Sequence, residues 1–150
     1  MRTALAVAGL LAVAAVGLAV PGVFGDFMSV SVYDTFRRTT TTAAANYPLG
    51  ALCSCGGLGL LILWAKFRRG WLVGLMLTVA VGGLALFALI WVVGINRGAL
   101  LGIDSPYHPF VSTAHYGPAF GPSLASVVLL FISAIASVMD AMIIRRSAAK

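Results

Sequence analysis

The chain has 150 residues, of which 61% are hydrophobic and 9% are charged, and its mean hydropathy is +1.03. A soluble domain of this length does not need so much apolar surface, so the composition excludes an ordinary soluble fold. The formal net charge is +6, but the basic residues mark the ends of apolar stretches, so we predict no binding to nucleic acid.

Four long apolar stretches predict four membrane-spanning helices, because a spanning helix needs about 20 predominantly apolar residues. We place the spans at residues 3–21, 48–65, 71–95 and 122–144, with outer loops at 22–47 and 96–121. The expected fold class is an all-α integral membrane protein, a multi-pass four-transmembrane-helix bundle. It forms a single domain over residues 1–150, which leaves no length for a separate soluble domain.

The charges are distributed unequally between the two ends of this predicted bundle. One end carries seven basic residues and one acidic residue: Arg2, Lys66, Arg68, Arg69, Arg145, Arg146, Lys150 and Asp140. The charges in the two outer loops cancel. Short loops rich in Lys and Arg stay in the cytoplasm, so we expect cytoplasmic N- and C-termini and two outer loops on the opposite side. The basic residues can also contact anionic lipid headgroups.

The first span is rich in small residues, which let helices approach closely in lipid. Gly9 and Gly17 lie about two turns apart on one face and are candidate helix-packing residues. The same segment also fits a signal peptide, with Arg2, an apolar run and small residues at 21–25. Cleavage there would leave three spans.

The first outer loop contains a segment, residues 27–33, in which apolar and polar residues partly alternate, as they do in a short strand. The Thr- and Ala-rich run at 39–45 is a candidate upward extension of the second helix. In that helix Cys53 and Cys55 point roughly 200° apart, so we expect two small packed residues rather than an intrahelical disulfide.

A tight turn at residues 66–70 joins the second and third spans and lies between Trp64 and Trp71. Tryptophan favours the headgroup level of a bilayer, so we expect this turn at the membrane surface. The third span carries small residues every four positions, at Gly74, Thr78 and Gly82, and these are further candidates for helix packing.

The second outer loop is rich in aromatic residues and prolines, which predicts an ordered loop, because disordered segments contain few aromatics. Tyr107, His108, His115 and Tyr116 are its candidate interaction residues. Imidazole and carboxylate groups suit zinc or copper, so Asp104 and the two histidines are an alternative metal site. Two histidines seven residues apart in a proline-broken loop are a weak signal, and we predict no metal and no cofactor.

The fourth span has a polar face formed by Ser126, Ser133, Ser137 and Asp140. We interpret Ser133 and Ser137 as packing residues that bond to carbonyl groups. Asp140 is the one ionisable residue within a span, and such residues are functional candidates. It lies about one turn from the basic end, where it can pair with Arg68, Arg69, Arg145 or Arg146. A proton or cation site is the alternative.

The topology resembles that of the claudin-like tetraspan proteins, including the amastins. Tyr116-Gly117-Pro118-Ala119-Phe120 is similar to their small-and-aromatic approach to the last helix, and Trp91 near the outer end of the third span also fits. The first loop here has no Trp and no Cys, whereas that family's first loop carries a Gly-Leu-Trp motif and two cysteines. The resemblance implies lateral association in the membrane.

No arrangement of catalytic residues is present, so we predict no enzyme activity. The expected function is a non-catalytic accessory subunit that packs laterally in a larger membrane protein complex. Its partners would be other integral membrane subunits, in a hetero- or homo-oligomer, and lipids. The alternatives are a claudin-like self-associating tetraspan and a small transporter or channel component.

Overall fold

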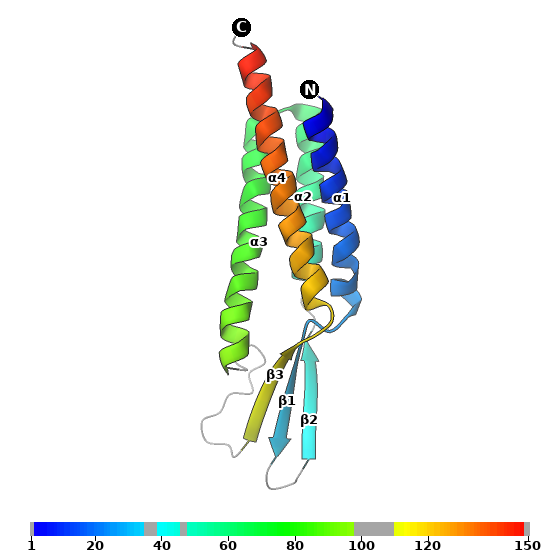
Figure 1. The fold of residues 1–150 in the computed structure, drawn as a ribbon, viewed down its shortest axis with the longest axis vertical. Helices are drawn as coiled ribbons and strands as arrows, with labels where there is room; N and C mark the ends of the chain where they lie inside the picture. Colours follow the sequence, from blue (N-terminus) through cyan, green and yellow to red (C-terminus); the bar gives the residue numbers. More distant parts are fainter. Residues whose placement is uncertain (1, 35–38, 46–47, 98–109, 149–150) are drawn as a thin grey trace.

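The computed structural model describes residues 2–34, 39–45, 48–97 and 110–148. These residues form four long helices and three short strands (Figure 1). The helices are α1 (Arg2–Phe24), α2 (Leu49–Phe67), α3 (Gly70–Arg97) and α4 (Phe120–Ala148). They run side by side as a bundle, and both chain termini lie at the same end of it.

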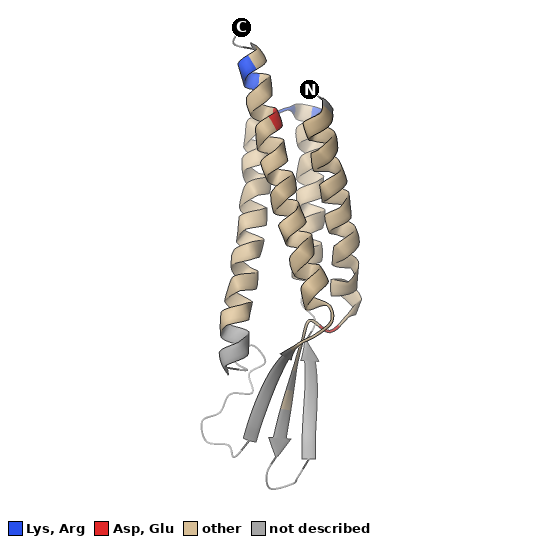
Figure 2. Cartoon of the chain, viewed as in Figure 1, with Lys and Arg blue, Asp and Glu red and all other residues tan. Residues whose placement is uncertain are grey.

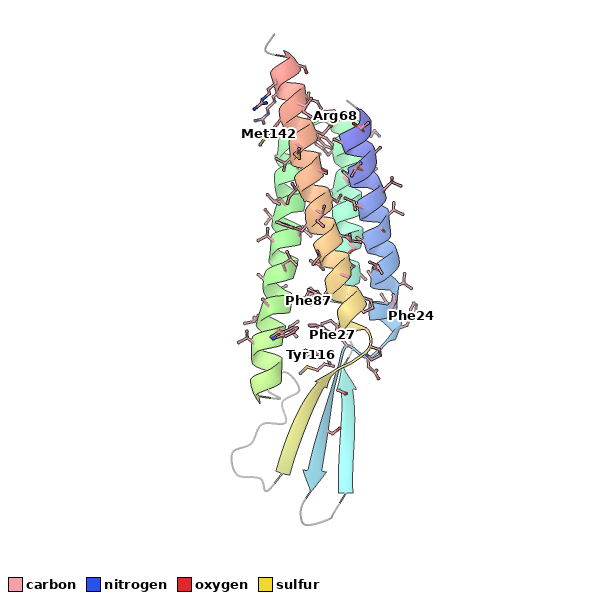
Figure 3. The ribbon with its side chains drawn as sticks, viewed as in Figure 1. Phe24, Phe27, Arg68, Phe87, Tyr116 and Met142 are labelled. Carbon is pink, nitrogen blue, oxygen red and sulfur yellow. The ribbon has the colours of Figure 1, made fainter. Side chains whose placement is uncertain are left out.

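All four helices are long and apolar enough to cross a membrane. The shortest, α2, has 19 residues, which corresponds to about 28 Å at 1.5 Å per residue, close to the hydrocarbon thickness of a bilayer. Large apolar side chains point away from the bundle on every helix, including Phe24, Leu52, Leu89 and Met142. Figure 3 labels Phe24 and Met142 among these outward residues. These features are those of a multi-pass membrane protein, as predicted.

The two ends of the bundle differ in charge and in structure. We call the end with both termini the basic end, because it carries Arg2, Lys66, Arg68, Arg69, Arg145 and Arg146 against Asp140 alone among the described residues (Figure 2). We call the opposite end the sheet end. There β1 (Met28–Asp34) lies between β2 (Thr39–Ala45) and β3 (Phe110–Tyr116) in an antiparallel sheet of order β2-β1-β3.

The sheet corrects one sequence-based expectation and confirms another. The run at 39–45 does not extend the second helix: it is strand β2, whose register pairs Thr39 with Asp34 and Ala45 with Met28. Four consecutive β-branched threonines favour a strand over a helix. The fold is mainly helical, as predicted, and the sheet lies at one end of the bundle. The strand expected at 27–33 is confirmed, shifted by one residue, as β1.

The helix boundaries lie beyond those predicted at several ends. Helix α1 continues past Pro21 to Phe24, and the Pro21 carbonyl accepts a hydrogen bond of 2.8 Å from the Gly25 N–H. Helix α4 begins at Phe120, two residues earlier than expected. Pro122 therefore lies in the first turn of α4, where its missing N–H has no intrahelical partner to lose.

Alanine and serine side chains form the close seam between α1 and α4. Every third or fourth residue of α1 is fully buried along this seam, at Ala8, Ala12, Ala15 and Ala19. The Ser133 hydroxyl of α4 donates a hydrogen bond of 2.7 Å to the Ala8 carbonyl oxygen. The first segment is thus an integral part of the packed bundle.

A second set of small residues, all glycines, lies where other helices meet α4. An added Cβ at Gly83 of α3 would lie 2.9 Å from Val127 Cγ1 and 3.0 Å from Cys53 Sγ. At Gly50 the added atom would lie 3.0 Å from the Ser123 backbone, and at Gly57 it would overlap the Leu130 side chain. These glycines set how closely the helices approach.

Neighbouring glycines in α2 provide a matched test of this packing. Gly57 faces Leu130, whereas an added Cβ at Gly56 meets nothing within 4 Å. Alanine favours a helix by about 1 kcal/mol over glycine, and overpacking costs about 1–3 kcal/mol. We therefore expect Gly57→Ala to be less stable than Gly56→Ala by about 2 kcal/mol, measured by denaturant unfolding in mixed micelles. Equal stability of the two variants would contradict the packing described here.

Candidate functional site

The basic end contains a buried ion pair between the α2–α3 turn and α4. Arg68 Nη1 donates to Asp140 Oδ2 at 3.1 Å. The Asp140 side chain is only 2% exposed, whereas that of Arg68 is 45% exposed. Of the four arginines that the sequence left open as partners, the structure thus places Arg68 against Asp140.

The backbone of Arg68 is held in an unusual conformation. Its φ of 52° and ψ of 28° lie in the left-handed region, and its N–H donates to the Trp64 carbonyl at 2.8 Å. Glycine is the usual residue at such a helix C-terminus, because other residues are strained there. The Arg68 guanidinium also lies 4.8 Å from the centre of the Trp64 ring. An arginine occupies this strained position in place of glycine, and its side chain makes the contacts with Asp140 and Trp64 that glycine could not make.

The polar face of α4 is buried along its whole length. Ser123, Ser126, Ser133, Ser137 and Asp140 are all at most 1% exposed. Three of the hydroxyls donate to carbonyl oxygens, Ser126 to Ser123 at 2.7 Å, Ser137 to Ser133 at 2.9 Å, and Ser133 across to α1. Ser137 is therefore bonded within its own helix, whereas Ser133 joins two helices.

Aromatic side chains connect the helices to the sheet end. Tyr116 and Phe120 have ring centres 4.2 Å apart, and Phe120 lies 5.1 Å from Phe27 and 5.7 Å from Phe87. The Tyr116 hydroxyl donates to the Trp91 carbonyl at 3.1 Å, and burial raises the pKa of this phenol. Figure 3 shows Phe27, Phe87 and Tyr116 at this junction. Tyr116 thus contributes to internal packing.

The glycines that the sequence singled out lie elsewhere, on outward faces. An added Cβ at Gly9, Gly17, Gly74 or Gly82 would meet nothing within 4 Å. Thr78 is exposed, and its hydroxyl donates to the Gly74 carbonyl of its own helix at 3.0 Å. None of these four glycines therefore packs against another helix of the described chain.

Gly9 lies in an apolar groove between α1 and α2. The groove has a volume of about 390 Å³ and is lined by Leu5, Gly9, Val13, Leu58, Leu61, Ile62 and Ala65. Every one of these lining residues is uncharged. A second apolar hollow, of about 300 Å³, lies between α3 and α4 beside Phe87 and Trp91.

The remaining candidates from the second outer loop are only partly described. Tyr107 and His108 lie outside the described residues, as does Asp104. The backbone of His115 pairs with Ser29 in the sheet, and its side chain is not described. Within the described residues no three His, Cys, Asp or Glu side chains gather as metal ligands. Cys53 is buried and Cys55 exposed, both as free thiols.

Sequence reasoning missed the glycines that pack inside the bundle. Gly22, Gly50, Gly57 and Gly83 approach other helices, but their spacing does not distinguish them from the outward glycines. It also missed Gly117, where an added Cβ would overlap the Asp26 carbonyl. The Gly117-Pro118 pair in the sequence could have indicated a tight connection at this point.

Comparison with known protein families and with curated protein sequences found no match to this chain.

Proposed function

We propose that this chain is a non-catalytic accessory subunit that packs laterally against other integral membrane subunits. In this proposal the basic end faces the cytoplasm and the sheet end forms an ordered outer cap. The topology is supported by the seven basic residues near one end and by the balanced charges of the outer loops.

The observation that carries the proposal is the outward position of Gly9, Gly17, Gly74 and Gly82. Glycine within a helix is less favourable than alanine by about 1 kcal/mol, and these four glycines relieve no crowding within the part of the chain that the structure describes. Small residues at a lipid-facing surface allow the backbone of another helix to approach closely. The α1–α2 groove around Gly9 has the shape for such an approach, and its apolar lining suits a hydrophobic helix.

A transporter or channel function has less support. Three of the buried α4 hydroxyls are bonded to carbonyl oxygens, and Val127 and Leu130, both fully buried, interrupt the polar face. Asp140 lies at one end of the bundle and is paired with Arg68. A conducting path requires polar groups that exchange partners with water or an ion. Three of the four buried α4 hydroxyls and Asp140 already have partners, and of these groups the Ser123 hydroxyl alone has none among the described residues.

The lateral-packing proposal predicts that Gly9→Leu separates assembly from folding. A leucine side chain at Gly9 has open space around it, so the fold should tolerate it while the groove is filled. We expect about tenfold less partner to co-purify in mild detergent, which corresponds to about 1.4 kcal/mol.

The matched control is Ala14→Leu, at an exposed position of α1 that does not line the groove. It should leave co-purification unchanged. Crosslinking in the native membrane would distinguish unlike partners from copies of this chain, and copies alone would favour the self-associating alternative. Recovery of the wild-type protein solely as a monomer would contradict lateral assembly.

A further inference from the structure

A small cavity at the basic end lies between the α2–α3 turn and the last turns of α4. Its volume is about 170 Å³, and it is lined by Trp64, Arg68, Gly70, Ala141, Ile144 and Arg145. A water molecule's share of liquid volume is about 30 Å³, so the cavity has room for a larger polar group. The charged residues in its lining are two arginines, Arg68 and Arg145.

The two guanidinium groups are positioned by different contacts. Asp140 and the Trp64 ring hold Arg68 in place. Arg145 reaches back over the start of α3, where its Nη2 lies 3.1 Å from the position that a Cβ on Gly70 would occupy. The absence of a side chain at Gly70 thus leaves space for Arg145 at the cavity.

The charge around this cavity is positive after the ion pair is counted. Asp140 balances one guanidinium, and Arg68 retains N–H donors beyond the one that it gives to Asp140. Gly70 is the first residue of the 28-residue helix α3, and a helix N-terminus adds a partial positive charge. One further negative charge would balance the second guanidinium.

The position of the cavity indicates which anion is available to it. Trp71, beside the turn, is 60% exposed, and an exposed tryptophan marks the headgroup level of a bilayer. Arginine binds phosphate oxygens through paired N–H donors. Basic pockets between transmembrane helices bind anionic headgroups. A zwitterionic headgroup would bring its own cation beside the arginines and suits the site less well.

We propose that this cavity binds the phosphate of an anionic phospholipid headgroup between Arg68 and Arg145. The lipid is held by two guanidinium groups and by the start of α3, and Trp64 and Ile144 line the apolar side of the site. This inference rests on the membrane-spanning character of the helices and not on the proposed partner.

The test is native mass spectrometry of the detergent-purified protein, titrated with phosphatidylglycerol or with phosphatidylcholine of the same acyl chains. The wild-type protein should prefer phosphatidylglycerol. Arg145→Gln should weaken phosphatidylglycerol binding about tenfold, which corresponds to about 1.4 kcal/mol, because it removes a charge-assisted hydrogen bond to the phosphate. Arg146→Gln removes the same charge one residue away, outside the cavity lining, and should change binding less than about twofold.

A second pair of variants leaves the charge unchanged. Gly70→Leu fills the cavity and should weaken phosphatidylglycerol binding as Arg145→Gln does, whereas Gly74→Leu faces open space and should not. Equal losses in Arg145→Gln and Arg146→Gln, or no preference between the two lipids, would overturn the proposal. Displacement of the lipid by millimolar inorganic phosphate would assign the site to a free anion and overturn the lipid assignment.

Discussion

Replacing Arg68 with alanine is expected to destabilise the bundle by about 2 kcal/mol, because it leaves the Asp140 carboxylate buried without a partner. Removing one member of a fully buried pair costs about 3–5 kcal/mol. The expected value is lower because Arg68 is 45% exposed and water screens part of the interaction. The measurement is the unfolding free energy in mixed micelles, followed by circular dichroism.

A double-mutant cycle identifies the interaction that is lost. The double variant Arg68→Met with Asp140→Leu removes both charges and should recover most of the stability, because apolar replacement of a whole buried pair is often neutral. The control Arg69→Ala removes a neighbouring charge that does not pair with Asp140, and it should change stability by less than about 0.5 kcal/mol. Additive single effects in the cycle would show that the pair does not couple.

Replacing Gly117 with alanine is expected to have the largest effect, a loss of at least about 3 kcal/mol or failure to fold. Gly117 N–H donates to the Phe27 carbonyl at 2.9 Å, and Ala119 N–H donates to the Asp26 carbonyl at 3.2 Å. These bonds join the chain entering α4 to the chain leaving α1. An added Cβ would overlap the Asp26 carbonyl group, and backbone atoms cannot rotate away as a side chain can.

Gly121 provides the matched control for this junction. It lies four residues later, at the start of α4, and an added Cβ there meets nothing within 4 Å. Gly121→Ala should therefore fold normally and retain the contacts among the junction aromatics, which tryptophan fluorescence of the nearby Trp91 can report. If Gly117→Ala were as stable as Gly121→Ala, the close approach of these two backbone segments would not occur in the protein.

Patterns that depend on composition and local chemistry were predictable. The four spans follow from the length of the uninterrupted apolar stretches, because a stretch of about 20 apolar residues is the length that a membrane-spanning helix needs. The polar face of α4 follows from helical periodicity, since Ser133, Ser137 and Asp140 recur at three and four residues. The possible partners of Asp140 were limited to four arginines, because Arg68 and Arg69 of the turn and Arg145 and Arg146 of α4 lie at the same end of the bundle as Asp140.

Patterns that depend on which helix is a neighbour were not predictable. Gly56 and Gly57 are adjacent in the sequence, yet only Gly57 faces Leu130. Strand β2 could not be predicted from local sequence either. The Thr-rich run lies just before a helix in the sequence, and it forms a strand because β1 pairs with it in the folded structure.

The sequence by itself therefore determined the number of spans, the basic end and the small set of possible ion pairs. Only the tertiary structure decided which small residues lie inside the bundle and which face outward, Gly57 and Gly83 on one side and Gly9 and Gly74 on the other. The physical reason is that both faces of a membrane helix are apolar. Lipid is as hydrophobic as the protein interior, so the contrast that marks the buried face of a soluble helix is absent.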